Sequence, residues 1–125
     1  MIFTLSQVAL GGALGSMLRY LTNVGVMRLI GPGFPYGTMI VNILGSFMMG
    51  LLVVFLAHKY ATRLAPFLMT GVLGGFTTFS AFSLDTLTIW ERGDQTLALI
   101  YVAASVGLSL LAIVAAVTLF RGVFA

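Results

Sequence analysis

The sequence contains no cysteine, one histidine and few charged residues. The lack of cysteine excludes a disulfide framework and thiolate chemistry. Six basic and three acidic residues amount to 7% of the chain, whereas a soluble domain is about a quarter charged. Because 60% of the residues are hydrophobic and the mean hydropathy is +1.14, we expect one integral membrane domain spanning residues 1–125.

The few charges also limit the partners and reactions that we expect. The isoelectric point near 9.8 comes from thinly spread basic residues, which fits membrane anchoring better than nucleic-acid binding. His58 lies beside Lys59 in a polar connector and is not expected to bind a metal. There is no cluster of nucleophile and base within the hydrophobic runs and no phosphate-binding glycine loop, so we do not expect an enzyme.

Four hydrophobic runs are long enough to be membrane-spanning helices, since a helix needs about 20 residues to cross a bilayer. They cover about residues 3–29, 36–57, 64–90 and 96–120. A Gly/Pro loop at 31–35, a polar connector at 58–63 and a charged turn at 91–94 separate them. The first run carries Arg19 and has no basic segment before it, so we expect it to be a retained helix and not a signal peptide. The predicted fold is all-α.

The third run contains an unusual segment at 71–83, which is rich in glycine, hydroxyl residues and phenylalanine. Lipid cannot hydrogen-bond a polypeptide backbone, so such a segment is expected where a helix is interrupted to line a polar path. We predict a break near residues 74–78. Small residues four apart, Gly11 and Gly15 in the first run and Gly71 and Gly75 in the third, also predict close helix packing.

Polar residues form two stripes at four-residue spacing within the spans: Thr38, Asn42 and Ser46, and Tyr101, Ser105 and Ser109. In the third run, Phe79 and Phe82 are one turn apart, and Ser83 is one turn beyond Phe79. Hydroxyl and amide donors, together with the positive edges of phenyl rings, suit an anion better than a cation. Two alternatives stay open: a hydroxyl can simply bond its own helix backbone, and the rings can be ordinary packing residues.

The basic residues do not fix the orientation of four spans. One side would carry Lys59, Arg63 and Arg121, and the other Arg28 and Arg92. A difference of one is too small for the positive-inside rule, either because the chain has few charges or because it inserts both ways and forms an antiparallel homodimer. Arg19 lies inside the first span, where we favour anchoring or pairing with Asp85 over direct anion binding.

Three ordered motifs resemble the Fluc (CrcB-type) fluoride channel family along nearly the whole chain. They are Gly12-x-x-Gly-x-x-x-Arg-Tyr20, Gly37-Thr-x-x-x-Asn42 with Gly45-x-Phe47, and Gly74-Gly-x-Thr-Thr-Phe-Ser-x-Phe82. The resemblance implies a dual-topology antiparallel homodimer in the bacterial inner membrane that exports fluoride passively and lowers cytoplasmic fluoride. It implies a fluoride pathway along Asn42, Phe79, Phe82, Tyr101, Ser105 and Ser109 with Thr38 nearby, to which the turn spacing adds Ser83. It also implies a structural Na⁺ at the dimer centre, held by the backbone carbonyls of Gly74 and Thr77.

Two other functions remain as alternatives. Small multidrug transporters also work as antiparallel dimers of four-helix chains, but proton coupling needs a membrane-embedded carboxylate, typically in the first helix. The first run has no Asp or Glu, and Asp85 lies near the end of the third. A non-conducting accessory subunit would need no polar stripes. Flux of fluoride, chloride and a cationic drug would distinguish the three.

Overall fold

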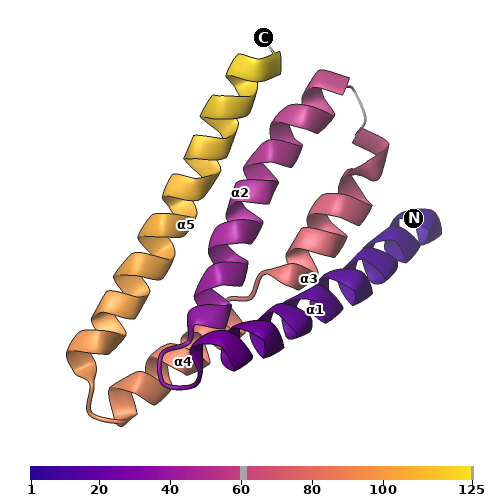
Figure 1. Ribbon diagram of the computed structural model, residues 1–125. Coiled ribbons are helices and arrows are strands. Elements are labelled where there is room, and N and C mark those ends of the chain that lie inside the picture. The colour runs from indigo at the N-terminus through magenta and orange to yellow at the C-terminus, as the bar shows by residue number, and fades with distance from the viewer. Residues whose placement is uncertain (60–61, 125) are drawn as a thin grey trace.

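The computed structural model describes residues 1–59 and 62–124, and in these ranges all the regular structure is helical (Figure 1). Residues 60 and 61 of the predicted connector lie outside the described residues. In chain order the elements are α1 (Ile2–Ile30), α2 (Tyr36–Lys59), η1 (Thr62–Leu64), η2 (Pro66–Leu73), α3 (Gly74–Phe76), α4 (Ser80–Glu91) and α5 (Gln95–Phe124). The predicted all-α class is confirmed for this part of the chain.

Three segments of the described chain are long and apolar enough to cross a membrane: Tyr36–His58, Thr62–Glu91 and Gln95–Val123. They correspond to the second, third and fourth predicted spans. The first predicted span forms the 29-residue helix α1, which is less apolar than α2 and α5 and is not among the three. Polar side chains, including Gln7, Arg19 and Asn23, interrupt its apolar sequence.

The third span is broken, but not at its glycine pair. The segment enters as the π-helix η2 and continues through α3, with Gly74 in ordinary helical conformation at φ −62° and ψ −37°. Thr77 is extended, with φ −85° and ψ 159°, and α4 begins at Ser80. The break therefore spans residues 77–79, at the C-terminal edge of the predicted region, and reorients α4 toward the start of α5 (Figure 1).

The glycines of this segment serve close packing instead. Gly11 and Gly15 of α1 lie directly against the backbone of η2 and α3. A Cβ atom added to Gly71 would lie 2.9 Å from Gly11 Cα, and one added to Gly75 would lie 2.6 Å from the carbonyl oxygen of Gly12. Larger residues would push the two backbones apart, so the predicted small-residue packing is confirmed.

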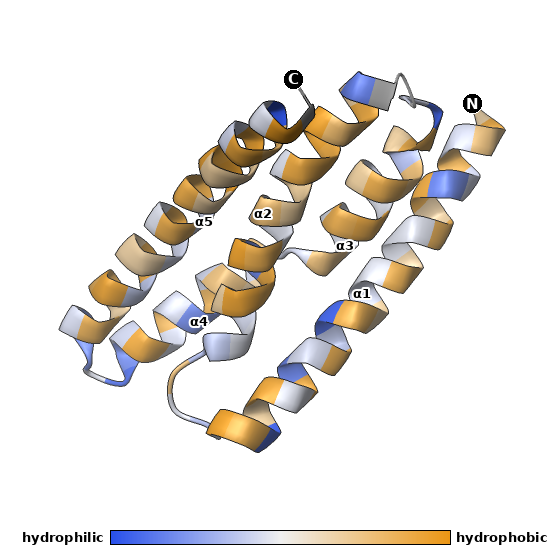
Figure 2. Ribbon diagram, turned by 45° about the horizontal axis from the view of Figure 1, so that its top comes forward, coloured by the Kyte–Doolittle hydropathy of each residue, from blue (hydrophilic) through white to orange (hydrophobic). Residues whose placement is uncertain are grey.

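Many large apolar side chains of the described chain are exposed. Figure 2 shows hydrophobic residues along the whole length of the long helices, and only 17–28% of the apolar window of each candidate span is buried within the chain. The buried cluster is small and joins α4 to α5 through Phe82, Ile89, Ala98 and Tyr101. An outward apolar surface of this extent suits lipid or another protein chain as its surroundings.

Candidate functional site

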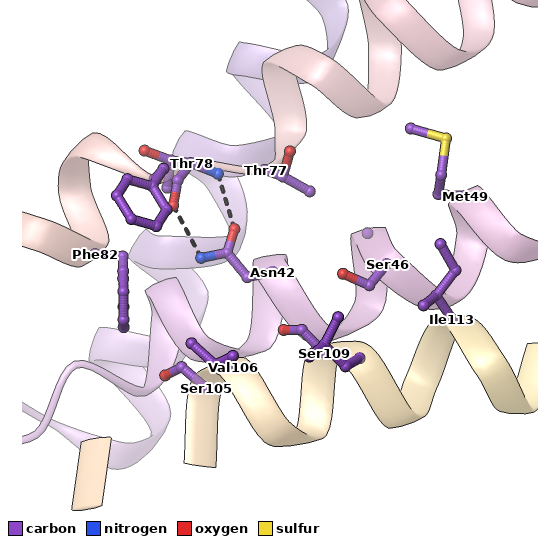
Figure 3. A pocket seen from close by; sticks show the side chains of 13 residues that line it. Asn42, Ser46, Met49, Thr77, Thr78, Phe82, Ser105, Val106, Ser109 and Ile113 are labelled. Atoms are coloured by element: carbon purple, nitrogen blue, oxygen red, sulfur yellow. Dashed lines mark hydrogen bonds between the residues drawn. The ribbon is translucent and has the colours of Figure 1, made fainter. Parts of the chain in front are cut away.

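An open groove of about 360 Å³ runs between α2, the break in the third span and α5 (Figure 3). The described residues that line it include no Asp, Glu, Lys or Arg. Its polar lining consists of six side chains from three separate parts of the sequence: Asn42, Ser46, Thr77, Thr78, Ser105 and Ser109. Such a groove offers hydroxyl and amide groups without a fixed charge.

Asn42 holds the break in place through two hydrogen bonds to one residue. Its Nδ2 donates to the Thr78 carbonyl at 2.9 Å, and the Thr78 N–H donates to Oδ1 at 2.8 Å. The Thr78 hydroxyl in turn accepts the N–H of Ala81 at 3.1 Å in the first turn of α4. Side chains thus satisfy backbone groups that the broken helix leaves open at membrane depth.

This arrangement changes how Asn42 can serve a passing ion. The sequence predicted an amide that is free to face the path, whereas the structure uses both the oxygen and the nitrogen on Thr78. A primary amide has two N–H donors, and one of them remains for the groove that Asn42 lines. Asn42 therefore has a structural duty in addition to the predicted one.

Ser105 and Ser109 present hydroxyls with no hydrogen-bond partner among the described residues. Both oxygens are shielded from solvent, and Ser105 is 4% exposed. The hydroxyls of Ser83, Thr86 and Thr88 instead donate to the carbonyls four residues earlier. Backbone bonding, the ordinary explanation of a hydroxyl in a membrane helix, therefore applies to those three but not to Ser105 and Ser109.

The two phenylalanines border the groove at the break. Their ring centroids are 5.5 Å apart, with an angle of 59° between the ring planes. Phe82 is buried and also packs on Tyr101 at 5.3 Å, whereas Phe79 is 76% exposed. Phe82 therefore packs firmly within the chain, while Phe79 lines the groove and is largely exposed.

Three residues predicted for the pathway do not line this groove. Tyr101 is fully buried and its hydroxyl donates to Asp85 at 3.1 Å, while Thr38 is buried at 7% exposure. Ser83 is exposed on α4, and its hydroxyl donates to the Phe79 carbonyl at 3.0 Å. Their place in a pathway stays a prediction, although the Tyr101 ring packs on Phe82, which lines the groove.

Sequence reasoning did not place Ser46, Thr77 and Thr78 among the side chains of the pathway, yet all three line the groove. The signal for Ser46 was already present, since it lies one turn beyond Asn42 in the same stripe. The position of Thr78 depends on its contact with a residue 36 positions away, which spacing alone does not reveal.

Arg19 lies beside the break and not beside Asp85. Its Nε donates to the Gly75 carbonyl at 3.0 Å, and the side chain is half-buried. Among the described residues, the ion pair formed within the chain joins Arg92 to Asp94 at 3.3 Å. The predicted pairing of Arg19 with Asp85 is thus not found in the single chain.

The backbone at the break fits the predicted cation ligands. In an unbroken α-helix the Thr78 N–H would donate to the Gly74 carbonyl four residues earlier, but it donates to Asn42 Oδ1 instead. Likewise the Ala81 N–H donates to the Thr78 hydroxyl and not to the Thr77 carbonyl. Both carbonyl oxygens thereby lose their helical donors, and Gly74 is exposed. Freed carbonyls are suitable ligands for a hard cation.

Comparison with known proteins shows the family to which this chain belongs. Residues 6–117 match the family described as "CrcB-like protein, Camphor Resistance (CrcB)". The chain is 67% identical over 122 residues to a "Fluoride-specific ion channel FluC" of Cereibacter sphaeroides, with 98% of each chain covered. Proteins with the same name from Paracoccus denitrificans and a Ruegeria species are 61% identical over 122 residues and 56% identical over 124, again with 98% of each chain covered. This multi-pass membrane chain belongs to the CrcB-like family.

Proposed function

We propose that this protein is a passive, fluoride-selective ion channel that lowers cytoplasmic fluoride. The carrying observation is the groove, in which hydroxyl and amide groups face one space that no carboxylate of the described chain lines. The names of the relatives, which are curated as fluoride-specific channels, support the choice of ion.

Fluoride is small and holds its water tightly, so a selective path must replace that water with hydrogen-bond donors. The unpartnered hydroxyls of Ser105 and Ser109 and the remaining amide hydrogen of Asn42 are such donors. Each contact must be strong enough for entry and weak enough for exit. The edges of the Phe79 and Phe82 rings carry positive quadrupole and would add weak attraction at the break.

A proton-coupled transporter of cationic drugs is a poorer match. Such a mechanism needs an ionisable carboxylate facing the substrate path. Asp85 does not line the groove, and its Oδ2 accepts the hydrogen bond of the Tyr101 hydroxyl. A non-conducting subunit would leave the shielded, unpartnered hydroxyls of Ser105 and Ser109 without a purpose.

The assembly that we propose is an antiparallel, dual-topology homodimer in the bacterial inner membrane, with α1 as a fourth span. Three features support it: the groove is open in a single chain, the groove residue Phe79 is largely exposed, and the basic residues are nearly balanced. A second copy would close the groove, and lipid would cover the remaining outward apolar surface. Two copies would then provide two fluoride pathways.

We also propose a structural Na⁺ at the centre of this dimer. The carbonyl oxygens of Gly74 and Thr77, which lose their helical donors at the break, would come from both copies. Four such oxygens would replace water around the cation and so offset the desolvation free energy of placing it at membrane depth. Arg19, which donates to the neighbouring Gly75 carbonyl, would fix the backbone geometry and not bind the ion.

Flux from liposomes tests the function. Purified protein should release trapped fluoride passively, without a proton gradient, and should release neither chloride nor a cationic drug at a comparable rate. Empty liposomes and liposomes with the Asn42→Asp variant serve as controls. Proton-dependent drug uptake would support the transporter instead, and the absence of any flux would support an accessory role.

A further inference from the structure

Ser46 is a polar residue of the groove to which the proposed pathway gives no role. It lies one helical turn beyond Asn42 on α2, is half-buried, and has no hydrogen-bond partner among the described residues. Ser109 lies one turn beyond Ser105 on α5. Along the groove, Figure 3 shows Asn42 and Ser105 nearer to Phe82, followed by Ser46 and Ser109.

The two serine hydroxyls share one feature, since neither has a hydrogen-bond partner among the described residues. The Ser109 oxygen is shielded from solvent and unpartnered, and such a group costs about 1–3 kcal/mol unless something accepts its hydrogen. The Ser46 hydroxyl is likewise not used by its own helix, although a carbonyl lies four residues earlier at Asn42. Two donors that line one space without a protein acceptor are arranged for an acceptor from outside the chain.

We infer that Ser46 and Ser109 form a second anion subsite, one helical turn along the groove from Asn42 and Ser105. The inference rests on the proposed function and adds a donor, Ser46, to it. An ion at the Asn42 end would pass from one pair of α2 and α5 donors to the next. Two weak sites in succession allow an ion to leave the first as it reaches the second.

The far end of the groove explains why this second pair matters. Met49 and Ile113 line the groove beyond the two serines, and neither offers a hydrogen-bond donor (Figure 3). An ion at this end has the Ser46 and Ser109 hydroxyls as the last donors among the side chains that line the groove. Losing either hydroxyl should therefore raise the barrier to passage there, and the other should not compensate for it.

Fluoride efflux from liposomes tests the subsite with Ser46→Ala, Ser109→Ala and the double variant. Each single change should slow efflux about tenfold, the effect of one lost hydrogen bond to a charged group. The double variant should lose clearly less than the hundredfold product, because both hydroxyls would hold the same ion. Ser6→Ala is the matched control, since Ser6 is exposed on α1 and its hydroxyl donates to the Ile2 carbonyl.

Thermal stability in detergent supplies the second measurement. Ser46→Ala should leave stability unchanged, because its hydroxyl bonds no other group of the described chain. Wild-type efflux in Ser46→Ala, a hundredfold loss in the double variant, or a joint loss of stability and efflux would each overturn the shared subsite. If the wild-type protein itself released no fluoride, the proposed function would fail, whereas normal wild-type efflux with an unaffected Ser46→Ala would refute this inference alone.

Discussion

Replacing Asn42 is the sharpest test of how the break is held open. In Asn42→Ala the Thr78 N–H and carbonyl would each lose a partner now at 2.8 and 2.9 Å. An unsatisfied backbone group costs about 1–3 kcal/mol when buried, and Thr78 is half-buried, so we expect a loss of about 2–4 kcal/mol. Thermal unfolding in detergent should shift down by several degrees, and fluoride efflux should fall with it.

Asn42→Asp adds a second effect, because the ionised carboxylate accepts hydrogen bonds but donates none. One of its oxygens would still accept the Thr78 N–H, while the other would face the Thr78 carbonyl, now 2.9 Å from Nδ2, with like charge. We expect lower stability at neutral pH and no measurable fluoride efflux. A protonated carboxyl has one donor and one acceptor, so part of the stability should return at acidic pH.

Asn23→Asp is the matched control for the added charge, since Asn23 is also half-buried, lies in α1 against Gly37, and has no hydrogen-bond partner among the described residues. The decisive measurement is the thermal unfolding temperature of both Asp variants at neutral and acidic pH. If Asn42→Asp unfolds like the wild type at neutral pH, or if acid changes both variants equally, the pair with Thr78 does not hold the break.

Three further predictions address the rings, the glycine pair and the assembly. Phe79→Ile should strongly reduce fluoride efflux without changing stability, whereas Phe82→Ile should also destabilise the chain because Phe82 is buried. Wild-type efflux in both variants would show that the rings are not part of the pathway. Gly75→Ala should destabilise the chain itself, because the added Cβ would lie 2.6 Å from the Gly12 carbonyl oxygen. An added Cβ at Gly74 would lie 3.6 Å from the Met69 carbonyl oxygen, so Gly74→Val should impair only dimerisation and its dependence on Na⁺. Normal dimers of Gly74→Val would refute the central Na⁺ site. Two or three lysines added on one side should inactivate the protein until an oppositely locked copy is co-expressed, and full activity of one locked form would contradict the antiparallel dimer.

The helical elements could be predicted from the sequence because hydropathy and the Gly/Pro loop depend on local composition. The four runs correspond to α1, α2, the η2-to-α4 segment and α5. A broken third span was also predictable, since glycine and hydroxyl residues are concentrated at 71–83. Its position was not, because Gly74 and Gly75 have small side chains for packing against α1 and do not themselves end the helix.

Helical spacing could predict only which residues of the candidate site share one face of a helix. Asn42, Ser105 and Ser109, which belong to the two four-residue stripes, line one groove. Spacing could not show that Tyr101 turns away to Asp85, or that Ser83 bonds its own helix. Both outcomes depend on which hydrogen-bond partner lies nearest in space, and that is set by how α4 and α5 pack.

The geometry of the break links the two ion sites that we propose. Asn42 accepts the hydrogen bond of the Thr78 N–H, which would otherwise be donated to the Gly74 carbonyl. The Gly74 carbonyl oxygen is therefore free to bind Na⁺. The same amide retains one hydrogen for the groove, where fluoride would pass. A change at Asn42 should therefore weaken both fluoride conduction and the response of dimer stability to Na⁺. A change at Ser105, which contacts no backbone of the break by hydrogen bond, should weaken conduction alone, and that separation follows directly from where each side chain makes its bonds.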